Sequence, residues 1–150
     1  EGHQSCGVIR CSQSHGNVEY CCQCTEYPCE KYQDTMRYDH FIPCRNADRD
    51  FSRMLSGGPE AYRAMMDEKT CFLRRLLDGC NDGRKKTFFC TAVNLLELAD
   101  IRTVMNLLDR EAVPQAPLKE RAALAVKLFQ DMADIRGISL KLIRKPRKKQ

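Results

Sequence analysis

Apolar side chains recur every three or four residues through most of the chain beyond residue 45, which is the spacing of one face of an α-helix. Glycines, prolines and turn residues interrupt this pattern and mark where helices begin and end. The predicted helices cover residues 47–55, 59–78, 84–96, 100–108 and 117–136. The pattern therefore predicts that this part of the chain is mostly α.

Particular residues fit the ends of these helices. The Gly57–Gly58 pair ends the first helix, and Pro59 suits the first turn of the second, where its missing N–H costs nothing. Asp100 is a candidate N-cap, because a carboxylate can accept hydrogen bonds from the free N–H groups of a helix start. Pro117 opens the last helix, and Gly137 ends it.

The segment 138–143, Ile-Ser-Leu-Lys-Leu-Ile, alternates apolar and polar residues as a short β-strand does. A single strand needs a partner. The segment is therefore expected to be an edge strand, a pairing site between chains, or merely extended chain.

Residues 1–44 differ from the rest because they are rich in cysteine, tyrosine and polar residues. We divide the chain into this Cys-rich segment, 1–44, and a helical body with a basic C-terminal tail, 45–150. A short helix is expected from Pro28 to Met36, with Cys29 in its first turn, where the helix dipole favours a thiolate. The expected fold is mostly α, with a small Cys-rich knuckle packed on the helical body.

Six of the ten cysteines lie within the first 29 residues, and thiols this close in sequence usually bind a metal, carry a cluster or form disulfides. Cys21 and Cys24 form a Cys-x2-Cys pair, which lets two thiolates converge on one ion from a tight loop. Cys29 can approach the same ion from a third direction, and Cys11 or Cys6 completes the set of four ligands. Cys22 is expected to point away or to replace its neighbour Cys21.

We therefore predict a metal site, with disulfides and free thiols as the alternatives. The candidate ligands are Cys11, Cys21, Cys24 and Cys29, with Cys6 as the contested fifth. Zinc is the expected metal, and an all-thiolate zinc site is closed to substrate and hence structural. An iron–sulfur cluster is the alternative, although the tighter run of Cys-x2-Cys pairs typical of clusters is missing.

A mixed ligand set would need a histidine. The chain has His3, His15 and His40. A histidine in a polar loop is typically exposed, so the thiols alone are the expected ligands.

Residues 6–11 read Cys-Gly-Val-Ile-Arg-Cys, and residues 21–32 read Cys-Cys-Gln-Cys-Thr-Glu-Tyr-Pro-Cys-Glu-Lys-Tyr. Together these two stretches resemble the signature of a prokaryotic family of small cysteine-rich proteins known as domain of unknown function 3795. The matching residues are Cys6, Cys11, Cys21, Cys24, Pro28, Cys29, Glu30 and Lys31. Residues 82–96 are similar to a stretch found in some members. Because the family is regarded as zinc-binding and has no assigned reaction, the resemblance implies a metal and a helical remainder, but no activity.

Family members usually carry further cysteines before the equivalent of Cys6. The resemblance therefore leaves open whether Cys6 binds together with Cys11 or with residues upstream of Glu1.

Charge is concentrated at one end of the chain. The net charge is +5, yet residues 1–140 hold 19 basic and 20 acidic residues. The tail holds six basic residues and no acid: Lys141, Arg144, Lys145, Arg147, Lys148 and Lys149. Such a tail can bind nucleic acid, and a solvated, solubilising terminus is the alternative.

These features favour a binding or adaptor module with a structural zinc. A thiol-based redox or metal-sensing protein, or a nucleic-acid binder using the tail, are the alternatives. No arrangement of catalytic residues stands out, so no enzyme is predicted.

Since no apolar run approaches the roughly 20 residues needed to span a bilayer, no membrane partner is expected. Lone cysteines within amphipathic helices favour a reducing cytoplasm.

Overall fold

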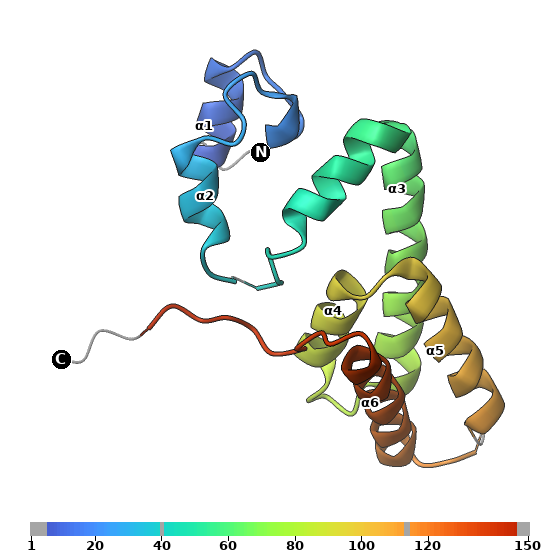
Figure 1. The fold of residues 1–150 in the computed structure, drawn as a ribbon. Coiled ribbons are helices and arrows are strands. Elements are labelled where there is room, and N and C mark those ends of the chain that lie inside the picture. The colour runs from blue at the N-terminus through green and yellow to red at the C-terminus, as the bar shows by residue number, and fades with distance from the viewer. Residues whose placement is uncertain (1–5, 40, 113–114, 147–150) are drawn as a thin grey trace.

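Helices account for the regular structure, as the apolar periodicity predicts. The computed structural model describes residues 6–39, 41–112 and 115–146. Within these residues it contains no β-strand and the following helices: α1 (Gly7–Ser14), the short 3₁₀ helix η1 (Cys21–Gln23), α2 (Glu30–Met36), α3 (Ala47–Cys80), α4 (Lys86–Leu95), α5 (Leu98–Glu111) and α6 (Leu118–Ile135). The expected mostly α fold is confirmed (Figure 1). In the described part of the chain, no helix is long and apolar enough to cross a membrane.

Helix α3 consists of two helical halves that meet at a bend at Gly58 (Figure 1). Gly58 has a φ of 84° and a ψ of 158°, a backbone conformation that residues other than glycine rarely adopt. Pro59 follows directly and reinforces the break, because its ring is incompatible with a helix continuing through it. The two helices predicted on either side of the Gly57–Gly58 pair are therefore present.

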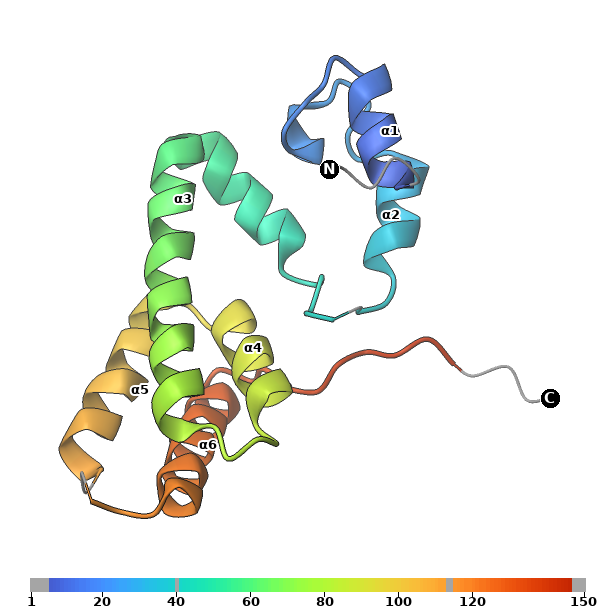
Figure 2. The same cartoon turned by 180° about the vertical axis from the view of Figure 1, so that it is seen from behind.

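The second half of α3 packs with α4, α5 and α6 into a helical body (Figures 1 and 2). The core side chains that are 0% exposed are Leu76, Phe89, Ala92, Leu96, Ile101, Val104, Ala125, Phe129 and Ala133. The rings of Phe89 and Phe129 meet edge to face with centroids 6.3 Å apart. Burying a large apolar side chain contributes about 1.5–3 kcal/mol, so this cluster stabilises the body.

Charged side chains fasten the first half of α3 to the junction of α4 and α5. Arg53 Nη2 donates to Glu97 Oε2 at 2.6 Å, and Arg49 Nη1 lies 2.8 Å from Glu97 Oε1. Lys69, on the second half of α3, meets the same junction: it is only 3% exposed and donates from Nζ to the Leu96 carbonyl oxygen at 2.7 Å. Burial lowers the pKa of the Lys69 ammonium, and nearby carboxylates, including that of Glu97, oppose this shift.

Helix α5 begins before the residue expected to cap it. Glu97 occupies the N-cap position, and Asp100 is buried in the first turn. Arg136 donates from Nη2 to Asp100 Oδ1 at 2.6 Å. The expectation that Asp100 is the N-cap is therefore wrong, because its carboxylate pairs with a guanidinium that follows α6. The expected ends of α6 are confirmed, since Pro117 is its N-cap and Gly137, with a φ of 65°, follows its last turn.

The segment 138–143 forms no β-strand in the described residues, so the expectation of a strand there is wrong. Arg45 donates to the main-chain oxygens of Ser139 and Lys141, the latter at 3.2 Å. Asp39 accepts the N–H of Ile143 at Oδ2 and donates its own N–H to the Ile143 oxygen, both at 2.8 Å. The side chains of Arg45 and Asp39 and the Asp39 amide thus form hydrogen bonds with the backbone of residues 139–143. A neighbouring strand would otherwise supply such bonds.

The Cys-rich segment lies beside the first half of α3 and apart from α4, α5 and α6 (Figures 1 and 2). The ring of Phe51 on α3 lies 5.8 Å from the ring of Tyr27 and 5.9 Å from that of Tyr32. Both tyrosine hydroxyls donate to Asp48 Oδ1, at 2.8 Å from Tyr27 and 2.5 Å from Tyr32. These hydrogen bonds, the one from Tyr32 first, lower the pKa of Asp48. The aromatic contact joins the Cys-rich segment to α3.

Candidate metal centre

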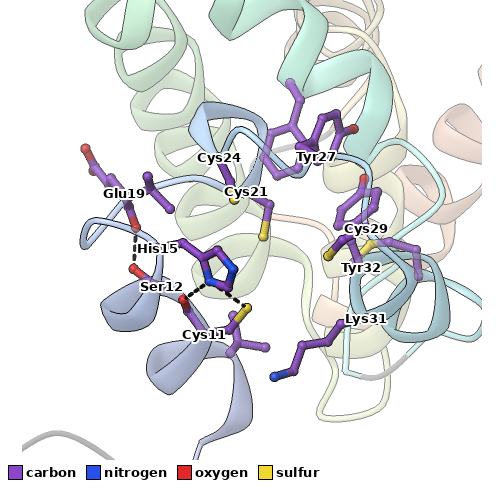
Figure 3. A pocket seen from close by; sticks show the side chains of 14 residues that line it. Cys11, Ser12, His15, Glu19, Cys21, Cys24, Tyr27, Cys29, Lys31 and Tyr32 are labelled. Atoms are coloured by element: carbon purple, nitrogen blue, oxygen red, sulfur yellow. Dashed lines mark hydrogen bonds between the residues drawn. The ribbon is translucent and has the colours of Figure 1, made fainter.

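Four cysteine side chains line one cavity in the Cys-rich segment (Figure 3). They are Cys11, Cys21, Cys24 and Cys29, the four residues that the sequence singles out as candidate ligands. The cavity has a volume of about 170 Å³, and Phe51 of α3 contributes to its wall. The fold therefore gathers these four thiols from separate parts of the segment.

Local hydrogen bonds shape the turn that carries the Cys-x2-Cys pair. The N–H of Cys24 donates to the Cys21 carbonyl oxygen at 3.0 Å, which closes η1. The side-chain oxygen of Gln23 accepts the N–H groups of Glu19 and Tyr20 at 3.0 and 2.9 Å. The closed turn leaves both Cys21 and Cys24 lining the cavity (Figure 3).

Cys11 and Cys29 reach the cavity from α1 and from the start of α2. The expected helix began at Pro28, with Cys29 in its first turn, but α2 begins at Glu30 and Cys29 is its N-cap. The Cys29 carbonyl oxygen accepts the N–H of Gln33 at 3.1 Å, as an N-cap carbonyl does. Cys29 therefore precedes the helix instead of lying within it.

The pKa of Cys21 reflects the gathering of thiols. Burial raises the pKa of this thiol, and the charges of Cys29, Cys11 and Cys24 raise it further. A cation among the four would reverse the repulsion, since a coordinating metal deprotonates thiols. The donor set therefore suits a soft metal ion.

The side chains as they stand do not form a coordination shell. Across residues 6–39, 41–112 and 115–146, no group of three or more His, Cys, Asp or Glu side chains is arranged so that it could hold a metal ion. Zinc–sulfur bonds are about 2.3 Å long, so the four sulfur atoms would have to turn towards one another to share an ion. The four residues share a cavity, and their joint ligation stays a prediction.

His15 also lines the cavity, although the sequence favours an exposed histidine. Its Nδ1 lies 2.8 Å from the Cys11 carbonyl oxygen and 3.7 Å from Cys11 Sγ, and its Nε2 lies 3.2 Å from Glu26 Oε2. Both ring nitrogens are therefore engaged by oxygen atoms. The four-residue spacing of Cys11 and His15 at the end of α1 is the sequence signal for this contact. His3 and His40 lie outside the described residues.

Cys6 and Cys22 do not line the cavity. Cys6 is the N-cap of α1, and the nearby backbone N–H groups of Ile9 and Val8 lower the pKa of its thiol. Burial raises the pKa of the Cys22 thiol. The arrangement favours Cys11 over Cys6 as the companion of Cys21, Cys24 and Cys29.

The basic tail is exposed as far as the structure describes it. Lys141, Arg144 and Lys145 have exposed side chains, and no acidic residue follows Asp134 in the sequence. The other tail residues named as candidates, Arg147, Lys148 and Lys149, lie outside the described residues. Nucleic-acid binding by the tail stays a prediction.

Comparison with protein-family models, curated proteins and solved structures gives no match for this chain. The resemblance of residues 6–31 to the cysteine-rich prokaryotic family therefore stays a prediction. The chemistry of the cavity is the basis on which a function can be argued.

Proposed function

We propose that the Cys-rich segment binds one zinc ion through Cys11, Cys21, Cys24 and Cys29. The observation that carries this proposal is that these four thiols line a single small cavity. Four thiolates are a ligand set that zinc accepts in tetrahedral sites. The ion would also offset the repulsion that contributes to the raised pKa of Cys21.

The proposed zinc is structural. With four protein thiolates bound, the ion keeps no open position for a substrate. The segment also has little apolar core of its own, since Tyr32 is the one buried side chain among residues 6–34. Structural zinc contributes about 10–16 kcal/mol of apparent binding free energy in small zinc-dependent folds, and that energy is coupled to folding. Zinc would therefore hold together a segment that burial alone stabilises weakly.

We further propose that the zinc-held segment is part of a binding or adaptor module in a reducing cytoplasm. Phe41 is 94% exposed and Ile42 is 49% exposed, both in the connection between α2 and α3. Exposed apolar side chains that lie together often mark protein contact sites. None of the ten cysteines is in a disulfide, as expected where thiols are kept reduced.

Elemental analysis of protein purified without added metal or chelator tests this proposal. We expect about one zinc per chain in the wild type and in Cys22→Ser, whose thiol lies outside the cavity. Cys21→Ser, the matched variant next to it, should lose most of the zinc. Folded wild-type protein without zinc would overturn the proposal. A brown protein with iron and acid-labile sulfide would instead favour the redox alternative.

The exposed cations of the tail support nucleic-acid binding as a second candidate function. Lys141, Arg144 and Lys145 are exposed, and no acid lies near them in sequence. We expect removal of residues 144–150 to abolish salt-sensitive retention on DNA, because phosphate contacts release counterions. Full-length protein that passes DNA at low salt without retention would exclude this function.

A further inference from the structure

The C-terminal segment meets the connection between α2 and α3 at Asp39 (Figures 1 and 2). The backbone of Ile143 exchanges two hydrogen bonds with this residue: its N–H donates to Asp39 Oδ2, and its carbonyl oxygen accepts the Asp39 N–H, both at 2.8 Å. Asp39 Oδ1 accepts the N–H of Cys44 at 2.9 Å, which closes the loop that carries Phe41 and Ile42. This carboxylate therefore holds the loop against the start of the basic tail.

The side chains that this junction brings together are accessible. Phe41 is 94% exposed, and its ring contacts no other aromatic ring in the described part of the chain. Ile42 and Ile143 are 49% and 50% exposed. Two residues of extended chain span at most about 7 Å, so the Cα of Phe41 lies within that distance of the Cα of Asp39. A flat apolar ring is thus exposed close to the point where the tail begins.

The cations of the adjoining tail are also available to a partner. Lys141, Arg144 and Lys145 are exposed and make no ion pair with any residue in the described ranges. Asp39 is the one acidic residue within 37–45 and 138–146, and its carboxylate is buried and paired with Arg45. Positive charge that no accessible acid nearby balances attracts a polyanion.

We propose that this junction binds single-stranded nucleic acid, with Phe41 stacked on an unpaired base and Lys141, Arg144 and Lys145 on the neighbouring phosphates. Proteins that bind single strands without sequence preference combine an aromatic platform with a positively charged track in this way. Residues 138–146 form neither helix nor strand and run away from the helical body (Figure 1), so their cations can follow a phosphate backbone. The proposal rests on the nucleic-acid binding proposed above for the tail, and it adds the base contact.

The ring, and not the tail, gives the preference for single strands. Cations bind the phosphates of a duplex as well as those of a single strand. A paired base in a duplex is covered on both faces by its stacked neighbours, whereas an unpaired base can turn out and stack on an aromatic side chain. Loss of the Phe41 ring should therefore weaken binding to single strands and leave binding to a duplex unchanged.

Fluorescence anisotropy with a labelled oligothymidylate of about 15 nucleotides, the length of a single-strand site, tests this contact. Phe41→Ala should weaken the affinity about fivefold or more, because one base–aromatic stack is lost. Phe41→Trp should retain the affinity. Leu118→Ala is the matched control, because it truncates another exposed apolar side chain, at the end of α6 opposite the tail, and it should bind as the wild type does.

Salt dependence and a second oligomer separate the ring from the cations. Phe41→Ala should keep the slope of log affinity against log salt, whereas Arg144→Gln combined with Lys145→Gln should make it shallower, since each phosphate contact contributes about −0.7 to that slope. An abasic oligomer of the same length should bind the wild type about fivefold or more weakly than oligothymidylate does. The tighter of oligothymidylate and oligouridylate identifies DNA or RNA as the ligand, and the loss in Phe41→Ala is expected with it.

The possible failures of these titrations are distinguishable. Equal affinity of the wild type and Phe41→Ala for oligothymidylate, or equal affinity of the wild type for the abasic oligomer, would overturn the stacking proposal and leave nucleic-acid binding by the tail in place. No binding of any oligomer or duplex at low salt would exclude that function and the stacking with it. Phe41-dependent binding to phosphatidylserine vesicles without binding to oligothymidylate would assign the junction to an anionic membrane and contradict the proposal.

Discussion

Arg45 donates from Nη1 to Asp39 Oδ2 at 2.9 Å, and this ion pair holds the C-terminal segment against the loop between α2 and α3. The Asp39 side chain is 2% exposed and also accepts the N–H groups of Cys44 and Ile143, at 2.9 and 2.8 Å. Arg45 in turn donates to the Lys141 carbonyl oxygen at 3.2 Å. One carboxylate thus organises two parts of the chain that are about a hundred residues apart.

Asp39→Ala should destabilise the protein by about 3 kcal/mol, because it leaves a partly buried guanidinium and two amides without their acceptor. Urea unfolding measures this loss. Hydrogen exchange at the Ile143 amide should also accelerate. Asp131→Ala, which removes an exposed carboxylate from α6, is the control and should change stability by less than about 0.5 kcal/mol. Equal stability of the two variants would contradict the role of Asp39.

The bend in α3 gives a paired prediction at two adjacent glycines. Gly58 has a φ of 84°, whereas Gly57 lies in the helix, with space for a Cβ that would meet Ala61 at 3.9 Å. Gly58→Ala should therefore cost about 1–3 kcal/mol. Gly57→Ala should stabilise by about 0.5–1 kcal/mol, because alanine favours helix. Thermal unfolding of both variants tests this, and equal effects would mean that the helix is not broken at Gly58.

Glu97 gives a prediction for acid pH. Burial would raise the pKa of this carboxyl, but the hydrogen bond from Arg53 and the charges of Arg49 and Arg53 outweigh burial, so its pKa is lowered. Its stabilising effect is therefore fully present above the unfolded pKa of about 4.3. That effect is lost as the pH falls through the lower folded value.

We expect the difference in unfolding free energy between the wild type and Glu97→Gln to shrink as the pH falls below about 4.3. Urea unfolding at a series of pH values measures this difference. Release of a bound metal at acid pH affects both proteins and cancels in the comparison. A difference that does not change with pH would contradict the lowered pKa.

The helical body could be predicted from the sequence because its signals are local. Apolar spacing and the residues Pro117 and Gly137 sufficed to find α6 and its ends. Asp100 was misread because a carboxylate before a helix has the same appearance whether it caps N–H groups or pairs with Arg136, a partner 36 residues away. The alternation in 138–143 was misread as a strand for a similar reason, since Arg45 lies more than 90 residues away.

The candidate site was foreseeable in part. Short spacings such as Cys21-x2-Cys24 constrain where thiols can meet, and these residues do share a cavity. The place of His15 was missed because its ring is held by the Cys11 carbonyl oxygen and by Glu26, contacts that depend on how α1 ends. The side-chain rotations that the proposed ligation would require depend on the ion, which apolar and polar patterns do not encode.

His15→Ala separates a four-cysteine site from a mixed one. Both ring nitrogens of His15 lie against oxygen atoms of Cys11 and Glu26, so we expect the variant to keep about one zinc per chain. Stability should fall by about 0.5–1 kcal/mol from the lost hydrogen bonds. Cys11→Ser, one helical turn earlier, should instead lose most of the zinc. Loss of zinc from His15→Ala with retention in Cys11→Ser would assign the fourth ligand to the histidine.

Zinc K-edge X-ray absorption on protein purified without added metal is the most direct measurement of the proposed centre. If Cys11, Cys21, Cys24 and Cys29 bind the ion, the first shell consists of four sulfur atoms at about 2.3 Å. Cys22→Ser should give the same spectrum, because Cys22 does not line the cavity. A shell of nitrogen or oxygen atoms at about 2.0–2.1 Å, or folded protein that holds no zinc, would contradict the account.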